Sequence, residues 1–469
     1  MSSVSSWLLW PLRKLFTIIF GSFETEELKK FLKLGLIFAT IIGTYWTLRV
    51  LKKAVFYKLV GAVYIPWAKT ASIIILIPLL FFYSKLLNKY PREKMFYILS
   101  IAYGTLFLVF SGLLLFTQST PAIVAARTGW AYFGTQAVGY GWYVLTETFG
   151  SLVVALFWAI STDITSPDSA KKGFYLVTAL AQFGGVFLPG FLSRLPLMLG
   201  LGTDAIVLFI AALLCFTLLL SMRWFFTSTP KNLLESFHGS NEKQVENEQE
   251  PGFLEGLKLL LSNKYLLGIF AVVSIYEIIV TIFDFNFDLL ANATYSGAEL
   301  TAYLGTYGSY VNIVALACLL GGVSNVTRWL GVSVAILMMP VIIGFAFFGF
   351  ISMSSLKFLF WLMVGSKAIN YALNGPAMKQ LYIPTSKDAR FKAQSWIEAF
   401  GSRFAKETGS VFNMTLKPLQ GKFGEVVGRA RYISMSSYFG FILVGFWFFA
   451  AYFLGKTYNK AIKEKKVIC

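Results

Sequence analysis

Long apolar stretches recur along the whole 469-residue chain and are separated by short polar segments. A helix that crosses a membrane needs about 20 mostly apolar residues. We count twelve such stretches, six before and six after a polar segment at residues 223–264. Most are unbroken apolar runs, which predicts helices and not the alternating strands of a membrane β-barrel. The predicted spans lie at about 31–51, 69–88, 95–117, 138–160, 173–195, 204–222, 265–290, 301–322, 329–351, 356–376, 395–415 and 432–455.

The composition also indicates a membrane protein. Hydrophobic residues make up 57% of the chain and charged residues only 14%, whereas a soluble domain has about 45–50% and about 25%. Six spans, a polar loop and six further spans are the plan of two-bundle transporters of the major-facilitator type. We therefore predict an all-α polytopic membrane protein with about twelve transmembrane helices in two six-helix bundles.

The segments outside the spans complete the predicted organisation. The loop sequence "HGSNEKQVENEQEP" is too polar to form a core of its own. The first residues do not resemble a cleaved signal peptide and predict an interfacial helix, with Trp7 and Trp10 at the level of the lipid headgroups. The predicted regions are an N-terminal segment at 1–30, bundles at 31–222 and 265–455, a central loop at 223–264 and a basic tail at 456–469.

The net charge of +18 would suggest nucleic-acid binding in a soluble protein. In a membrane protein it indicates cytoplasmic loops rich in Lys and Arg. With both termini inside, the inner segments hold about 25 Lys and Arg residues and the outer segments about 11. This bias predicts that both termini lie in the cytoplasm, and no nucleic-acid partner is expected. The outer cations, which would form a rim attractive to anions, are Lys52, Lys53, Lys58, Lys69, Lys417, Lys422, Arg429 and Arg431.

Residues that carry common enzyme chemistry are scarce. The only histidine is His238, in the polar loop, and Cys215, Cys318 and Cys469 show no metal-binding spacing. A zinc site or a Ser–His–Asp triad is therefore not expected. The chain has no GxxxxGK[ST] loop, so ATP hydrolysis is not supported either. We predict that the protein is not an enzyme and needs no cofactor or metal.

Several charged residues lie inside the apolar spans, where each costs about 2.5–3.5 kcal/mol at the bilayer centre. Arg49 lies three and four residues before Lys52 and Lys53, so these cations share one helical face. Glu277 and Asp284 are two turns apart and also share a face. The other charges inside the spans are Glu147, Lys367, Arg403, Lys406 and Glu407. Ion pairs between helices and snorkelling lysines are one explanation, and a binding site is the other.

Cations that converge on one cavity suit a multiply charged anion, because phosphate groups pair well with Arg and Lys. We expect Glu147 and Asp284 to pair with these cations between substrates, through ion pairs that join the two bundles and hold the empty carrier. The cations predicted to hold phosphates are Arg49, Lys52, Lys53, Arg403 and Lys406.

Five stretches together resemble the ATP/ADP translocase (TLC) family of plastids and obligate intracellular bacteria. They occur in the order of that family and cover about 30% of the chain. The stretches are "EELKKFLKLGLIF" through "YWTLRVLKK", "YIPWAKTASIIILIPLLFFYSKLLNKYPREKMFY", "ETFGSLVVALFWAISTDITSPDSAKKGFYLV", "SIYEIIVTIFDFNFD" and "NGPAMKQLYIPTSKDARFKAQSWIEAFGSRFAKETGS".

The resemblance implies a twelve-span major-facilitator-like fold and exchange of external ATP for internal ADP plus phosphate, or uptake of other nucleotides as in some members. It also implies that two lysines and two acids are functional, which by motif position are Lys52, Glu147, Asp284 and Lys406. The sequence departs from the family pattern in three places. Val50 follows the span-one arginine where an acid is common, Asp284 replaces a glutamate, and Phe287–Asp288 stands where Trp–Lys is common.

The preferred function is an adenine-nucleotide antiporter of a bacterial inner membrane, which works by alternating access as a monomer. The aromatic residues that could stack on the base, for which helix packing is the alternative role, are Tyr45, Trp46 and Tyr143. A proton-coupled nucleotide symporter, in which Glu147 or Asp284 titrates, is one alternative, and a carrier of another anionic metabolite is a second. A membrane-embedded enzyme or lipid scramblase is disfavoured, because no catalytic dyad with His or Cys is available.

Overall fold

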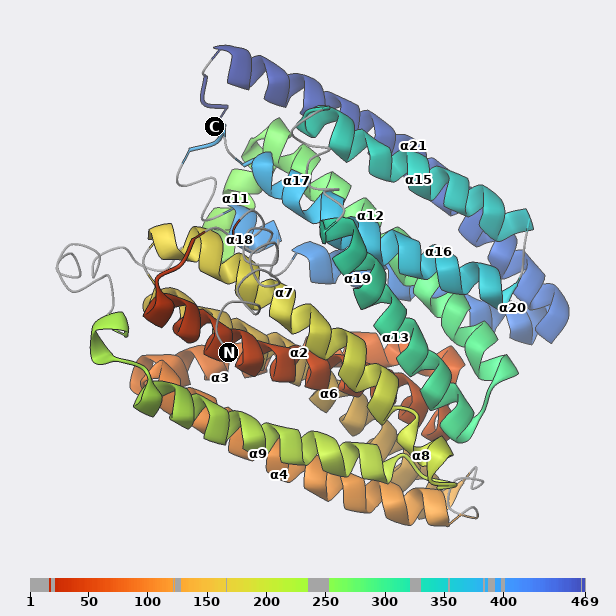
Figure 1. Cartoon of the computed structure of the whole chain (residues 1–469). Coiled ribbons are helices and arrows are strands. Elements are labelled where there is room, and N and C mark those ends of the chain that lie inside the picture. The colour runs from red at the N-terminus through yellow and green to blue at the C-terminus, as the bar shows by residue number, and fades with distance from the viewer. Residues whose placement is uncertain are drawn as a thin grey trace, which may run out of the picture.

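The computed structural model describes residues 17, 22–120, 122, 128–165, 167–234, 253–320, 330–352, 355–382, 384–386, 393–397, 401–464 and 466–468. Every regular element in these residues is a helix (Figure 1). The first half contains α2 (Thr25–Leu59), η1 (Ala62–Tyr64), α3 (Ile65–Lys89), α4 (Arg92–Ser119), α6 (Gly129–Asp163), α7 (Pro167–Leu192), α8 (Leu195–Met198), α9 (Ala205–Ser228) and η2 (Lys231–Leu233).

The second half is equally helical. Its elements are α11 (Phe253–Ser262), α12 (Lys264–Thr294), α13 (Gly297–Leu320), α15 (Val332–Ser352), α16 (Leu356–Ile369), the π-helical turn η3 (Asn370–Asn374), α17 (Gly375–Gln380), α18 (Gln394–Trp396), α19 (Ser402–Asn413), α20 (Leu416–Phe423) and α21 (Glu425–Glu464). The start of α2 and the end of α21 lie near α11 and α18, at what we call the terminal end; α8 and α20 lie at the opposite end (Figure 1).

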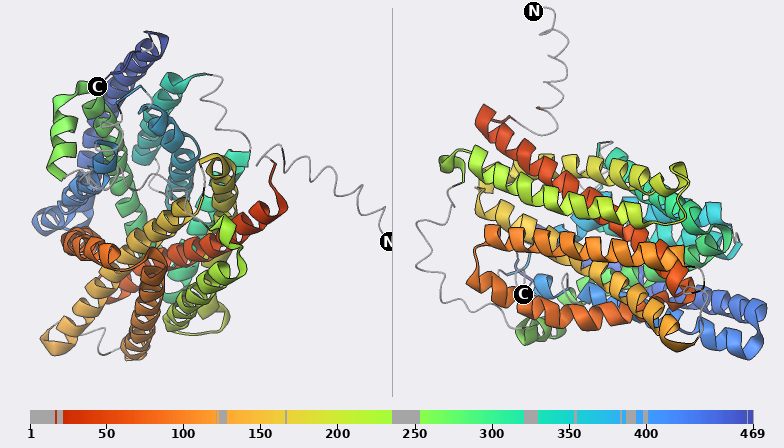
Figure 2. Two further views of the ribbon diagram at one scale, coloured as in Figure 1. Left: turned by 90° about the vertical axis from the view of Figure 1, so that its left-hand side faces the viewer. Right: turned by 90° about the horizontal axis from the view of Figure 1, so that it is seen from below.

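The two halves form two helix groups, as Figure 2 shows by their red-to-yellow and green-to-blue colours. One buried apolar cluster is drawn wholly from α2, α4, α6, α7, α9 and the residues that flank them. A second cluster is drawn mainly from the helices after α11, together with one face of α2. The predicted all-α fold with two bundles is confirmed.

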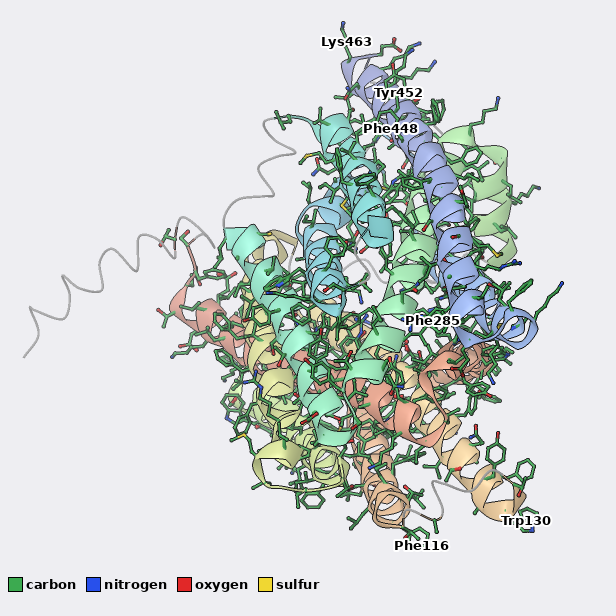
Figure 3. All side chains as sticks on the ribbon, turned by 90° about the vertical axis from the view of Figure 1, so that its right-hand side faces the viewer. Phe116, Trp130, Phe285, Phe448, Tyr452 and Lys463 are labelled. Carbon is green, nitrogen blue, oxygen red and sulfur yellow. The ribbon has the colours of Figure 1, made fainter. Side chains whose placement is uncertain are left out.

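Nine helices among the described residues are long and apolar enough to cross a membrane. The other three predicted spans correspond to α13, to α16 with η3, and to α18 with α19. Figure 3 shows why the surface suits lipid: the labelled Phe116, Trp130, Phe448 and Tyr452 project away from the helices. Because these large side chains are exposed, the multi-pass membrane prediction agrees with the surface as well as with the helix lengths.

The structure corrects the predicted ends of two spans. Helix α2 runs to Leu59, eight residues past the predicted end at 51, so Lys52 and Lys53 lie within a helix and are buried. Helix α3 begins at Ile65, and therefore Lys69 lies one turn inside it. These three lysines belong to the protein interior and not to the predicted outer rim, because the helices continue beyond the apolar runs that define a span in the sequence.

Some predictions fall on residues outside the described part. The interfacial helix with Trp7 and Trp10, most of the central loop with His238, and Cys469 are among them. The described end of the central loop is the short helix α11, which covers Phe253–Ser262.

Close packing of α2 against α7 depends on small residues. A Cβ atom added to Gly184 of α7 would collide with the backbone carbonyl of Ala39 on α2, which cannot move aside as a side chain can. Gly43 of α2 faces the carbonyl of Gly184 and the side chain of Leu188 in the same way. Small residues at helix interfaces allow this approach in membranes. The first bundle is therefore built around a contact that only glycine permits.

We expect Gly184→Ala to destabilise the first bundle by about 1–3 kcal/mol, the usual cost of overpacking. The measurement is the midpoint of thermal unfolding of the purified protein in detergent. Gly112→Ala is the matched control, because no atom lies within 4 Å of a Cβ at that position in α4. Equal midpoints for the two variants would contradict the packing argument.

Candidate functional site

A cavity of about 520 Å³ lies between the two halves, and most of the charged residues predicted inside the spans line it. Its walls come from α2, α3 and α6 of the first half and from α12, α16, η3 and α19 of the second. The cationic lining residues are Arg49, Lys52, Lys53, Lys69, Lys367, Arg403 and Lys406. The acidic lining residues are Glu147, Glu277, Asp284 and Glu407. The lining thus carries an excess of three positive charges.

Helix α2 places four polar side chains on the cavity wall because of their spacing. Tyr45, Arg49, Lys52 and Lys53 lie four, three and one residues apart, which keeps them on one face of the helix. The opposite face of α2 packs in the apolar core of the first bundle, for example through Leu51, which is fully buried. The core therefore fixes the rotation of α2 and with it the direction of these cations.

Three ion pairs each join two residues of the same half, one pair in the first half and two in the second. Lys52 Nζ of α2 bonds to Glu147 Oε1 of α6, and the ammonium lies 4.5 Å from the centre of the Tyr143 ring. In the second half, Lys367 Nζ donates to Asp284 Oδ1 at 2.9 Å. The third pair, Lys406 Nζ with Glu277 Oε1, is longer, at 3.6 Å.

Lys53 makes the ion pairs that join the two halves. Its Nζ donates to Asp288 Oδ1 of α12 at 2.7 Å and lies 3.6 Å from Asp284 Oδ1. Among the described residues no other ion pair crosses between the halves. The expectation that Glu147 also pairs across the bundles is wrong, because Lys52 of the same bundle holds it. Asp288 is 1% exposed and lies behind the cavity wall.

Arg49, Lys69 and Arg403 line the cavity without a carboxylate within 4 Å in the described part of the chain. The Arg49 guanidinium lies 4.8 Å from the centre of the Trp46 ring, and Arg403 Nη2 donates to Ser151 Oγ at 3.4 Å. Three cations without counter-ions in a cavity are costly unless an anion joins them. This arrangement is suited to a ligand with several negative charges.

Further polar contacts join the halves toward the opposite end. Lys417 Nζ of α20 donates to the Tyr64 hydroxyl at 2.5 Å, and Arg194 Nη2 donates to Thr306 Oγ1 at 3.1 Å. The Ser309 hydroxyl of α13 donates to the Val186 carbonyl at 2.7 Å. At the level of the cavity, the Thr70 hydroxyl donates to the Glu407 carboxylate. The halves are therefore fastened to each other from the cavity to the opposite end.

The structure brings every predicted site residue to this one cavity: Arg49, Lys52, Lys53, Glu147, Asp284, Arg403 and Lys406 all line it. Of the aromatic candidates, Tyr45 and Tyr143 line it as well, whereas Trp46 is buried beneath Arg49. Lys367 was predicted as a charge inside a span but was not assigned to the site, and it lines the cavity as well. The sequence analysis left out Tyr276, Asn370 and Tyr371, for which the sequence offers no comparable signal.

Solved transporters share the fold. A bacterial homologue of the iron transporter ferroportin, in an inward-facing state, matches with a TM-score of 0.58 at 12% identity, over 91% of this chain and 99% of that one. A D-xylose–proton symporter matches with a TM-score of 0.55 at 13% identity, over 89% and 96%. At these identities the likeness concerns the fold, which is of the predicted major-facilitator type.

Sequence comparison identifies the family. ADP,ATP carrier protein 1 of Rickettsia prowazekii is 26% identical over 503 residues, covering 98% of this chain and 97% of the relative. The chloroplastic ADP,ATP carrier protein 2 of Arabidopsis thaliana is 26% identical over 493 residues, covering 96% and 78%. A family model described as TLC ATP/ADP transporter matches residues 11–458. The predicted resemblance is confirmed, and the chain belongs to this family of carriers, the TLC ATP/ADP transporters.

Proposed function

We propose that the protein exchanges ATP for ADP, with phosphate, across a bacterial inner membrane by alternating access. The observation that carries the proposal is the cavity between the two bundles, in which three cations have no carboxylate within 4 Å among the described residues while the others are ion-paired. Membership of the ATP/ADP transporter family supports the same substrate class. The described lining comes from both halves of one chain, which supports a carrier that works as a monomer, and we assign no nucleic-acid partner.

The phosphates of the nucleotide would bind first to the unpaired cations. Arg49 and Arg403 offer planar guanidinium groups that hold two phosphate oxygens at once, and Lys69 adds a third charge. Lys52 and Lys406 contribute after the phosphates compete with their carboxylate partners. The four charges that the family resemblance marks as functional would therefore be paired in the empty carrier and shared with the substrate in the loaded one.

Alternating access requires the two bundles, residues 31–222 and 265–455, to move as two bodies. We place both termini in the cytoplasm, so that the terminal end is the inner one and the opposite end is the outer one. The contacts between the halves at the opposite end then close the outer side. Lys53 joins the halves beside the cavity and makes the ion pairs that must break when the outer side opens.

A second candidate mode, proton-coupled uptake, is favoured by Glu407. One oxygen of this carboxylate accepts a hydrogen bond from the Thr70 hydroxyl. The other oxygen is buried without a hydrogen-bond partner in the described structure. No cation lies within 4 Å of it in the described part of the chain. A carboxylate in the cavity that makes no ion pair among the described residues is the observation that favours this second mode, because Glu147 and Asp284 are both held by lysines.

Uptake into proteoliposomes distinguishes the two modes. We expect labelled ATP to enter vesicles preloaded with ADP at least about tenfold faster than empty vesicles, because the paired, empty cavity reorients slowly. A protonophore should leave this rate unchanged. Equal uptake into empty and loaded vesicles, abolished by the protonophore, would replace exchange with symport. A protein inactive toward every nucleotide would contradict both modes.

A further inference from the structure

We propose that Asn370, in the π-helical turn η3, reads the edge of an adenine base and so sets the base preference of the carrier. The inference rests on the proposed nucleotide function and adds to it the part of the cavity that recognises the base. Phosphates alone cannot distinguish ATP from GTP. A selective carrier needs a neutral hydrogen-bonding group in the cavity, and Asn370 is one that the ion pairs do not use.

The local sequence explains why the helix changes at this point. Pro376 has no N–H group, so the carbonyl four residues earlier loses its usual helical partner. The chain before it forms the π turn at Asn370–Asn374, between α16 and α17. Single π turns inside helices are rare, and those that occur are often found at functional sites. Here the turn directs two consecutive side chains, Asn370 and Tyr371, to the cavity wall.

A hydrogen bond fixes the amide of Asn370. Asn374, four residues later and buried, donates from Nδ2 to Oδ1 of Asn370 at 2.8 Å. This contact occupies one lone pair of the carbonyl oxygen. Among the described residues no hydrogen bond uses its Nδ2 donor or the second lone pair of Oδ1, so both can serve a ligand. The side chain can therefore offer one donor and one acceptor, side by side.

That donor and acceptor pattern matches adenine. Asparagine binds adenine in a bidentate manner, because the base presents an N6 donor beside an N7 acceptor. Guanine presents two acceptors at the same edge, O6 and N7, which suit Arg or Lys. A bidentate contact of this kind is worth a discrimination of about 5- to 150-fold against the wrong base. Asn370 therefore favours adenine over guanine.

The position of Asn370 along the cavity agrees with this role. Asn370 lies one turn after Lys367, and on α2 the Tyr45 ring lies one turn before Arg49. Helices α2 and α16 run in opposite directions (Figure 1), so Tyr45 and Asn370 are both displaced from these cations toward the terminal end. Tyr276, two turns before Asp284 on α12, is displaced the same way, since α12 runs parallel to α2 (Figure 1).

Three tyrosines of the cavity, Tyr45, Tyr276 and Tyr371, lie on the same side as Asn370, toward the terminal end. Charged residues line the cavity at both ends: Lys53, Lys69 and Lys367 lie toward the opposite end, and Glu277 with its ion-pair partner Lys406 lies beside Tyr276. Stacking of a base on aromatic rings is worth about 1–3 kcal/mol per base and does not depend on base identity. The tyrosines would hold any base, and Asn370 would choose among bases. A nucleotide fits with its phosphates among the cations and its base at η3.

The test compares competitors for labelled ATP uptake into ADP-loaded vesicles. For the wild type we expect unlabelled ATP to compete at a lower concentration than GTP. In Asn370→Ala the GTP-to-ATP concentration ratio should fall by about 5- to 150-fold, while inorganic triphosphate competes as before. Asn370→Gln, which keeps the amide, should retain part of the ratio. Asn292→Ala, an exposed asparagine outside this cavity, is the matched control.

Two outcomes in the alanine variant would overturn the inference. One is an unchanged ratio in Asn370→Ala. The other is an equal loss of affinity for ATP, GTP and triphosphate, which would mean that the variant damages the whole cavity. A wild type that exchanges nucleotides without any base preference would also refute the role of Asn370, yet it would leave the proposed function intact. A wild type that transports no nucleotide would refute the function itself.

Discussion

Replacing Arg49 with alanine is expected to reduce ATP–ADP exchange by about 10- to 150-fold while the protein still folds and inserts. The expected factor corresponds to one charge-assisted contact of about 1.5–3 kcal/mol. Arg49 lines the cavity and has no carboxylate within 4 Å in the described structure, so its removal leaves no buried acid without a partner. The loss should therefore fall on transport and not on stability.

The measurement is the initial rate of labelled ATP uptake into ADP-loaded vesicles, normalised to the amount of reconstituted protein. Arg49→Lys should retain part of the rate, because it keeps the charge and loses the planar group that holds two oxygens. Arg92→Ala is the control outside the cavity, where the arginine pairs with Asp163. Wild-type exchange by correctly inserted Arg49→Ala would contradict the assignment of the phosphate site.

The double substitution Lys53→Gln with Asp288→Asn is expected to uncouple exchange. It removes both ion pairs that join the halves beside the cavity, and it neutralises one cation together with one acid, so that no additional buried charge is left alone. The empty carrier should then reorient more easily. Efflux of labelled ADP into buffer without nucleotide should rise by about tenfold or more, the effect of one charge-assisted hydrogen bond.

The matched control is Lys52→Gln with Glu147→Gln. This pair has the same chemistry but lies within the first half, so its loss should lower exchange without raising efflux into plain buffer. Equal leakage from both double variants would show that charge in the cavity, and not the connection between halves, restrains the empty carrier. If neither double variant leaks, the ion pairs of Lys53 do not restrain the empty carrier.

The fold could be predicted from the sequence because membrane-spanning helices are long apolar runs. The ends of these helices could not be predicted. Lys52, Lys53 and Lys69 look like rim residues, since hydropathy falls where they begin, yet α2 and α3 continue through them. A charge that faces a polar cavity can lie inside a membrane helix, and a window of hydropathy does not register which way a side chain faces.

The charged residues of the site could be predicted from the sequence. Each of the seven predicted residues lines the cavity, because a charge within an apolar span needs a polar surrounding. The pairing was not predictable. Asp288 had been noted only as a departure from the family pattern, and its bond to Lys53 depends on how the two bundles meet. Asn370 could not be predicted because it is neutral. The tyrosines of the cavity could not be predicted because the chain has 23 tyrosines and the sequence does not distinguish the few that face the cavity.

The central claim, obligatory exchange of nucleotides, is tested most directly by counting molecules in both directions. Vesicles are loaded with ADP carrying one label and placed in ATP carrying another, and both labels are followed in the same sample. The account predicts that one ADP leaves for each ATP that enters, and that ADP stays inside when the outer solution contains no nucleotide. Entry of ATP without matching exit of ADP would contradict it.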